Sequence, residues 1–370
     1  MTSLTAALRA LAANRINLLI VFAPVSWVLS MTAPGSQWVF ITAAASLIPL
    51  AGVIGLGTEE LAERSGPALG GFLNATFGNA AELIIAVVAL NQGHVELVKA
   101  SIAGSIIGNL LLVLGFSFFL GGLSRRSQKF NRTAATNTTA MLFLGVVALV
   151  MPAVFDLTLY GTLDARPPAL TKLSLSTAIV LIIAYVGSLI YAFTADRDLF
   201  RPEAKGSHHD HKPHHHSGIS TATAIGLLGT GTVLTTIQAE LLIGALEPAL
   251  HQFGFTELFV GVVLVAIIGN AAEHYSAIVA ARRDQMTLAV EISVGSSAQI
   301  ALLVAPVVVL YSFALGHPMT LIFNPFEITA IALSVFATAM VTQDGESNWV
   351  EGLQLISVYA VIALAFYFIP

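Results

Sequence analysis

The sequence contains no cysteine and few charged residues. Without cysteine the chain has no disulfides, thiolate metal ligands or cysteine nucleophile, and its redox compartment is left undetermined. Charged residues make up 10% of the 370 residues, whereas a soluble domain usually carries about 25%. The sequence also lacks a glycine-rich loop followed by Lys and Ser or Thr, which argues against direct coupling to ATP.

Long apolar stretches are what the sequence has instead. Hydrophobic residues make up 56% of the chain and the mean hydropathy is +0.83. Stretches of about 17–25 apolar residues are long enough to cross a bilayer as helices. They predict an all-α polytopic membrane protein with about 11 transmembrane helices, at residues 16–31, 38–57, 71–90, 95–122, 137–155, 173–195, 219–246, 256–280, 287–315, 325–341 and 352–368.

One five-residue phrase occurs twice. Gly78-Asn79-Ala80-Ala81-Glu82 returns 191 residues later as Gly269-Asn270-Ala271-Ala272-Glu273, and the same offset carries Gly104-Ser105 onto Gly295-Ser296. The register indicates a duplication with one acid in each half. We therefore expect an N-terminal helix (1–33), a first five-helix repeat (34–195), a cytoplasmic His-rich loop (196–218) and a second five-helix repeat (219–370).

The basic residues predict the orientation. A cytoplasmic N-terminus places 13 of the 16 Lys and Arg residues on the cytoplasmic side, which is the bias that membrane proteins show. Glu82 and Glu273 then lie five spans apart, and an odd separation makes their helices cross in opposite directions. The repeats are expected to be inverted, as in secondary transporters whose site lies at the midplane between the halves.

The first span has an alternative interpretation. Arg9 and Arg15, the apolar stretch after them and the small residues near Ala33 also resemble a signal peptide. Its removal would leave ten spans, five in each repeat.

Two acids inside apolar spans need partners or a role, because a charged side chain at a helix centre costs about 2.5–3.5 kcal/mol on insertion scales. A divalent hard cation would neutralise Glu82 and Glu273, and calcium takes six to eight oxygen ligands that mix carboxylates, amides and hydroxyls. Asn79 and Asn270 each lie three residues before an acid and share its helix face. Further oxygens lie in the spans that follow, on Ser101, Ser105, Asn109, Ser293, Ser296, Ser297 and Gln299.

Without a cation, two facing acids in a medium of low dielectric constant are expected to take up protons. One site would then hold either a divalent cation or protons, which is the requirement for exchange. The alternative is that these polar residues only join helices by hydrogen bonds, as Ser and Asn often do in membranes.

The paired phrases and the residues after them, 100–115 and 295–306, resemble the two alpha-repeats of the cation/proton exchangers, which belong to the calcium/cation antiporter superfamily. The resemblance covers the second to eleventh spans. It implies calcium extrusion driven by protons, with no cofactor and no enzymatic activity. It gives the family's site roles to Glu82, Glu273, Asn79, Asn270, Ser105, Ser296, Ser297 and Gln299, and less directly to Ser101 and Asn109.

Other acids lie near the span ends. Glu59, Glu60, Glu240 and Glu247 are expected to line two access funnels, with interfacial carboxylates as the alternative. Glu257 and Glu327 are interpreted as interfacial, and His274 as a packing residue rather than a proton relay. Glu291 has no assigned role.

Six histidines at 208, 209, 211, 214, 215 and 216 fall in the loop where eukaryotic relatives often carry an acidic regulatory helix. They suit zinc or another transition metal, and the alternative is a solvated linker. Regulation by calcium at this loop is therefore in doubt.

Three other functions stay open: a sodium-coupled exchanger of the same superfamily, a cation channel and an intramembrane hydrolase. The expected partners are calcium, protons and the lipid bilayer, without nucleic acid. Compact length and short loops favour a prokaryotic plasma membrane, with a vacuole-type membrane as the alternative. Divalent selectivity, proton stoichiometry and oligomeric state are left open.

Overall fold

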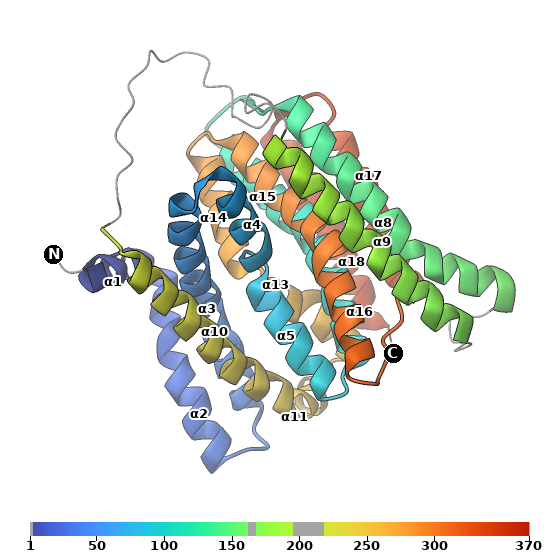
Figure 1. Cartoon of the computed structure of the whole chain (residues 1–370), viewed down its shortest axis with the longest axis horizontal. Helices are drawn as coiled ribbons and strands as arrows, with labels where there is room; N and C mark the ends of the chain where they lie inside the picture. Colours follow the sequence, from blue (N-terminus) through green and yellow to red (C-terminus); the bar gives the residue numbers. More distant parts are fainter. Residues whose placement is uncertain (1–2, 162–167, 195–217, 370) are drawn as a thin grey trace.

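The computed structural model describes residues 3–161, 168–194 and 218–369, and nearly all of this part is helical (Figure 1). Its elements in chain order are α1 (Ser3–Ala13), η1 (Arg15–Val21), α2 (Phe22–Thr32), α3 (Gln37–Arg64), α4 (Gly66–Phe77), α5 (Ala80–Asn91), α6 (Val95–Ile107), η2 (Gly108–Val113), α7 (Leu114–Gly122), β1 (Gln128–Lys129), α8 (Arg132–Tyr160), α9 (Pro168–Thr194), α10 (Thr221–Gly244), α11 (Leu246–Phe253), α12 (Glu257–Phe259), η3 (Val260–Val265), α13 (Ala266–Gly269), α14 (Ala271–Arg282), α15 (Met286–Gln299), η4 (Ile300–Val304), α16 (Ala305–Ala314), α17 (Pro325–Val341), β2 (Glu346–Ser347) and α18 (Trp349–Phe368).

Length and apolar composition mark eight described helices as able to cross a membrane, or nine if α11 and α12–α13, bent by 109°, form one span. The all-helical membrane fold expected from the sequence is thereby confirmed. The expected stretches at 71–90 and 256–280 are not single helices, because each is broken inside the repeated phrase. The stretch at 325–341 is α17, which has 17 residues.

Both breaks fall on the asparagine of the repeated phrase. Asn79, between α4 and α5, has φ −96° and ψ 22°, and Asn270, between α13 and α14, has φ −88° and ψ 8°. Neither asparagine caps the following helix with its side chain, so both amides are available to other partners. The sequence repeat is therefore also a repeat of backbone geometry.

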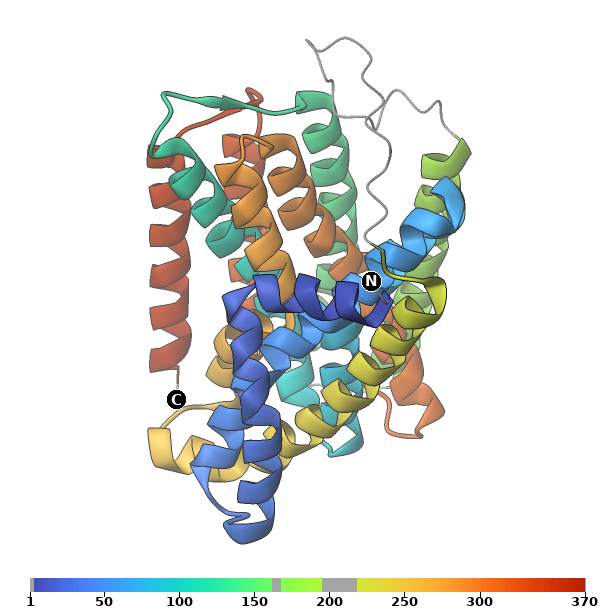
Figure 2. The same cartoon turned by 90° about the vertical axis from the view of Figure 1, so that its left-hand side faces the viewer.

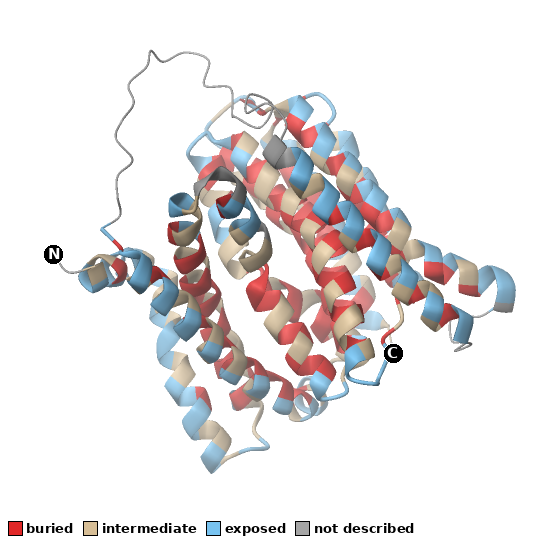
Figure 3. Ribbon diagram, in the orientation of Figure 1, coloured by how far each residue is buried: buried red, intermediate tan, exposed pale blue. Residues whose placement is uncertain are grey.

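Burial separates central helices from peripheral ones. The apolar window of the α6–α7 segment is 83% buried and that of the α15–α16 segment 72%, whereas only 6% of the window in η1–α2 is buried. Figure 3 shows this arrangement, with buried residues concentrated between the helices and exposed ones on the outer surfaces. Both central segments contain a π-helical turn, η2 and η4, which end 191 residues apart at Val113 and Val304. Such turns are frequent at functional sites.

The N-terminal region is not the single helix expected over residues 1–33. Asn14 has extended backbone angles and its side chain accepts a hydrogen bond from the Ile16 N–H, which separates α1 from η1 and α2. Figure 2 shows α1 lying across the long helices rather than along them. A second unexpected feature is the antiparallel pair β1–β2, which joins the α7–α8 connection to the α17–α18 connection.

Helices α3 and α10 pack closely along their length. A Cβ at Gly57 would lie 2.9 Å from the carbonyl oxygen of Ala224 and 2.9 Å from the backbone nitrogen of Leu228. Farther along, the buried Gln238 of α10 accepts hydrogen bonds from Ser26 of α2 (2.6 Å) and Ser46 of α3 (3.0 Å). One amide thus joins three helices, which form one layer.

We expect Gly57→Ala to destabilise the protein by about 1–3 kcal/mol, because the added methyl group meets backbone atoms that move only if the helices separate. Gly229→Ala, in α10, is the matched control, since a Cβ there has nothing within 4 Å. Tryptophan fluorescence during heating in detergent measures both variants. Equal unfolding temperatures would show that the α3–α10 contact is not tight.

Candidate ion-binding site

The two acids of the repeated phrases begin the second half of each broken helix. Glu82 lies in the first turn of α5 and Glu273 in the first turn of α14. Helix N-termini carry partial positive charge, which favours carboxylates there. In secondary transporters, the substrate and ion sites lie at such helix breaks, near the middle of the membrane.

Each acid packs against the glycine of the other phrase. A Cβ at Gly269 would lie 3.1 Å from Cγ and 3.6 Å from Oε1 of Glu82, and a Cβ at Gly78 would lie 3.7 Å from Oε1 of Glu273. The two phrases are therefore in mutual contact, and their glycines provide the space in which the carboxylates approach the opposite chain segment.

The carboxylates differ from the other buried polar groups around them. Both oxygens of Glu82 and Oε2 of Glu273 are buried without a hydrogen-bond partner among the described residues. An ionised carboxylate only accepts hydrogen bonds, and a buried charge without a partner is unfavourable. The carboxylates of Glu82 and Glu273 therefore suit a bound cation, which would compensate their charge, or protons, which would neutralise them.

A ring of amides and hydroxyls surrounds the acids. The Asn79 Nδ2 donates to Oε1 of Gln299 (2.6 Å), and the Asn270 Nδ2 donates to Oγ of Ser105 (2.8 Å). The Ser296 hydroxyl donates to Oδ1 of Asn79 (3.4 Å). Each asparagine thus bonds to the serine of the other repeat, which orients the amide oxygens of both phrases.

Asn109 and His274 close this ring on one side only. Nδ2 of Asn109 donates to Oδ1 of Asn270 and to Oγ of Ser296, both at 3.1 Å. Its Oδ1 lies 3.1 Å from Nε2 of His274, which therefore acts as the donor. His274 does not merely pack, as we expected, but fixes the orientation of Asn109. The equivalent residues in the other repeat, Leu83 and Ile300, are apolar.

Three expected serines stand apart from the ring. Ser297 donates to the carbonyl oxygens of Ser293 (3.0 Å) and Ile106 (3.5 Å), and Ser293 donates to that of Ala289 (2.9 Å), so both hydroxyls bond to backbone oxygens. Ser101 is buried in α6. The structure does not bring these hydroxyls into the ring with Asn79 and Asn270.

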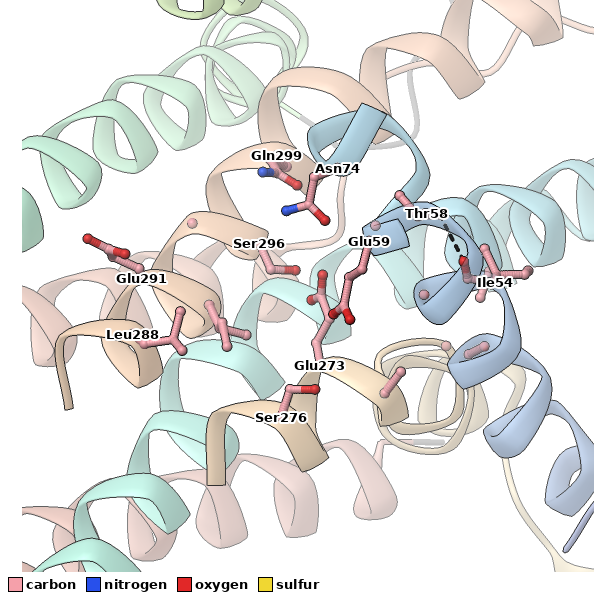
Figure 4. Close-up of a pocket in the computed structure, with 18 residues that line it drawn as sticks. Ile54, Thr58, Glu59, Asn74, Glu273, Ser276, Leu288, Glu291, Ser296 and Gln299 are labelled. Atoms are coloured by element: carbon pink, nitrogen blue, oxygen red, sulfur yellow. Dashed lines mark hydrogen bonds between the residues drawn. The ribbon is translucent and has the colours of Figure 1, made fainter. Parts of the chain in front are cut away.

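A cavity of about 290 Å³ leads to Glu273. Figure 4 shows the carboxylates of Glu59 and Glu273 pointing toward one another, with Asn74, Ser296 and Gln299 directed into the same space. Glu82 does not line this cavity, although Ala81 does. One acid is therefore accessible while the other is covered.

From Glu273 the cavity extends toward Glu59, near the end of α3, and Leu288, near the start of α15. We call this end of the bundle the basic face, because its helix ends and connections carry Arg64, Arg125, Arg126, Lys129, Arg132, Arg282 and Arg283. Asn74 and Ser276 also line the cavity and were missed from the sequence. Asn74 is a polar residue inside an apolar stretch, and Ser276 follows Glu273 by three residues on the same face. Both signals were present in the sequence.

The four acids expected to line access funnels lie in different surroundings. Glu59 lines the cavity, whereas the buried Glu60 lies 3.6 Å from Arg64 as an ion pair. Glu240 and Glu247 are exposed near the other end of the bundle, and neither lines a described cavity with the site. Glu291 lines the cavity wall with its carboxylate directed away from Glu273 (Figure 4).

The two acids expected at the membrane interface have specific partners. Glu257 lies 3.0 Å from Nδ1 of His94. Glu327 is 1% exposed and accepts a hydrogen bond from the Asn324 N–H at 2.8 Å, so it caps α17 rather than reaching outward. Among the described residues no group of three or more His, Asp or Glu side chains could hold a metal. The His-rich cluster at 208–216 lies outside the described residues.

Broken helices whose acids meet inside an all-helical membrane bundle are the construction of a secondary ion transporter. Sequence comparison defines the family: the model described as "Sodium/calcium exchanger protein" matches residues 35–194 and 223–368. The chain belongs to this family, whose members are transporters, and the expectation of a transporter rather than an enzyme is confirmed.

The chain is similar to proteins of known type over nearly its whole length. It is 42% identical to the Ca(2+)/H(+) antiporter of Synechocystis, covering 95% of this chain and 96% of that protein. It is 39% identical to the Ca(2+)/H(+) antiporter ChaA of Bacillus subtilis, covering 96% and 99%. The solved structure of native YfkE superimposes with a TM-score of 0.82 at 36% identity, covering 96% and 100%. The resemblance to cation/proton exchangers is thereby confirmed.

Divalent cations are expected to raise the unfolding temperature of the purified protein, because a ligand that binds only the folded state stabilises it by about 2.7 kcal/mol at 100 times its Kd. Glu82→Gln and Glu273→Gln should remove most of this shift. Glu247→Gln is the control, since it removes the same charge from an exposed position. A shift in both site variants as large as in the unmodified protein would place the cation elsewhere.

Proposed function

We propose that the chain exports calcium from the cytoplasm in exchange for protons, by alternating access to a site between Glu82 and Glu273. The observation that carries this proposal is the pair of neighbouring buried acids, whose carboxylates have oxygens without a hydrogen-bond partner in the described part of the chain. Of the two acids, Glu273 borders the cavity and Glu82 does not. The Ca(2+)/H(+) antiporters of Synechocystis and Bacillus subtilis, similar over nearly the whole chain, support calcium and protons as the exchanged ions.

The chemistry of the site explains the exchange. Calcium accepts a mixture of carboxylate, amide and hydroxyl oxygens, which Glu82, Glu273, Asn79, Asn270 and Ser296 supply. Calcium compensates the charge of both carboxylates, and protons compensate it equally well by neutralising them. Because either ion makes the other's binding unfavourable, release of calcium and uptake of protons are coupled at the same atoms.

Eleven spans follow if the broken and short helices are counted with the eight long ones. The additions are α4–α5, α12–α14 and α17, which give one N-terminal helix and two five-helix repeats of opposite topology. With the N-terminus in the cytoplasm, the basic face lies on the cytoplasmic side, as the bias of Lys and Arg requires. The cavity to Glu273 is then the cytoplasmic entrance. The bacterial relatives support a prokaryotic plasma membrane.

Alternating access follows from the inverted repeats. In the present arrangement cytoplasmic ions reach Glu273 past Glu59. In the opposite arrangement the equivalent path would reach Glu82 from the other side, past Glu240 and Glu247. Glu59 and Glu240 then serve as relays at the two entrances. Glu60, held by Arg64, secures the end of α3 rather than binding ions.

Sodium-coupled exchange is the second candidate, because the family also contains sodium/calcium exchangers. A sodium–calcium exchanger structure superimposes with a TM-score of 0.52 at 17% identity, which shows the fold alone. Transport measurements with imposed sodium and proton gradients distinguish the two candidates.

Calcium uptake into inside-out proteoliposomes is expected to require a pH gradient, to persist without sodium and to fall at least 100-fold in Glu82→Gln and in Glu273→Gln. Glu346→Gln, in strand β2, should transport normally. Uptake that follows a sodium gradient would support the second candidate. Conductive flux that no pH gradient influences would indicate a channel.

Glu59→Gln and Glu240→Gln are expected to slow calcium transport several-fold while leaving equilibrium calcium affinity within about threefold of normal. Glu59 lines the path to Glu273 and Glu240 is exposed, so both carboxylates act on how fast ions arrive rather than on the bound state. Initial rates and calcium titrations separate the two effects. If Glu240→Gln loses as much affinity as Glu273→Gln, then Glu240 belongs to the binding site instead.

A further inference from the structure

Helix α1 has no place in the exchange mechanism and does not cross the membrane. Its 11 residues span about 17 Å, too short for the hydrocarbon core of about 30 Å. Figures 1 and 2 place it beside the start of α10 and across the long helices. The position is that of a helix lying along a membrane surface.

The faces of α1 have different characters. Leu4 and Leu8 are 60% and 56% exposed and lie on one helix face, at i and i+4. Ala7 is fully buried in a cluster with residues of α10 and α3. The helical period places Arg9 on a side different from those of Ala7 and of Leu4 and Leu8. Apolar, docked and charged sides are thus separate, as in amphipathic helices that bind membrane interfaces.

Specific contacts attach α1 to α10. The Ser3 hydroxyl donates to Oγ1 of Thr223 (2.7 Å) and accepts from the Ser220 N–H (2.5 Å). Ala7 packs with Ile219 and Ala224 in a small hydrophobic cluster. These contacts leave the leucine face of α1 uncovered.

The apolar face of α1 adjoins a surface that faces lipid. Beyond Asn14 the chain continues through η1 and α2, where Leu18, Val21, Val28 and Met31 are all more than half exposed. Arg15 is exposed at the junction between the two surfaces. A leucine face continuous with a transmembrane surface and bordered by arginines matches a bilayer with anionic headgroups.

We propose that α1 is an interfacial anchor that binds anionic phospholipid in the cytoplasmic leaflet. Leu4 and Leu8 enter the acyl region, and Arg9 and Arg15 lie at the phosphate level. The choice of leaflet rests on the orientation given with the proposed function, whereas contact with lipid does not.

The anchor borders the cytoplasmic entrance. Leu11, Asn14 and Asn17 line a second cavity, of about 220 Å³, together with Glu59 and Ser276, which also line the cavity to Glu273. The lipid-bound helix therefore forms a wall next to the proposed relay carboxylate. Its depth in the leaflet sets the position of that wall.

The absence of cysteine allows a direct test. Single cysteines at Leu4, Leu8 and Ala13 would each carry a nitroxide spin label in the full chain, reconstituted in phosphatidylcholine vesicles with one quarter phosphatidylglycerol. Ala13 is the matched control, because it is exposed and lies on the face opposite Leu4. Labels at 4 and 8 should collide several-fold more often with oxygen than with a water-soluble nickel chelate, and the label at 13 should show the reverse. Equal water exposure at all three positions would overturn the proposal.

The headgroup part is tested in the same samples. Omitting phosphatidylglycerol, or introducing Arg15→Gln in its presence, should raise the collision rate of the nickel chelate at position 8 at least twofold. An unchanged rate in both cases would reject the anionic lipid. Calcium uptake by each labelled variant shows that the chain is folded, and the collision ratios do not depend on which ion drives transport. Failure of this proposal is therefore distinguishable from failure of the proposed exchange.

Discussion

Two carboxylates in a nearly uncharged membrane bundle are the constraint on which the rest of the structure depends. Glu82 and Glu273 have buried oxygens without hydrogen-bond partners among the described residues, so the bundle must supply another form of stabilisation. It places both at helix N-termini, where the backbone contributes positive potential. Those N-termini exist only because α4–α5 and α13–α14 are broken at Asn79 and Asn270. The breaks, the glycines beside them and the surrounding amides all follow from holding two acids at this place.

The duplication explains the common geometry, and the departures from it explain what is specific. Asn79 and Asn270 each bond to the serine of the opposite repeat. Asn109 and His274 bond to each other, whereas their equivalents, Ile300 and Leu83, belong to the hydrophobic core or pack against it. The ring is therefore anchored on one side by hydrogen bonds and on the other by apolar packing. In the proposed exchange, this asymmetry keeps one amide network fixed while the two symmetric acids bind and release ions.

The sequence predicted the membrane class, the repeat and the central acids, because each has a local signal: apolar length, an identical phrase and a charge inside an apolar span. It did not predict which hydroxyls join the ring, since Ser296 and Ser297 are neighbours that point to different helix faces. Nor did it predict the separate helix α1, whose alanine-rich sequence is too short and too weakly apolar to register as a span. Nor did it predict the cap that Glu327 makes, because position near a span end does not reveal that a carboxylate turns back to cap its own helix.

The amide ring limits what can move during exchange. Its amides and hydroxyls donate to one another across the two repeats, which joins Asn79, Asn109 and Asn270 into one unit and leaves a second lone pair on each amide oxygen for an ion. Access must then change through elements outside the ring. The cavity wall contains Ile54, Gly55, Thr58 and Glu59 of α3, and α3 is packed on α10 at Gly57 and joined to it and to α2 through Gln238. A shift of α3 alone would break contacts between backbones and a buried amide network, whereas a shift of the α2–α3–α10 layer would keep them. Movement of α2, α3 and α10 together is therefore the change of access that preserves these contacts.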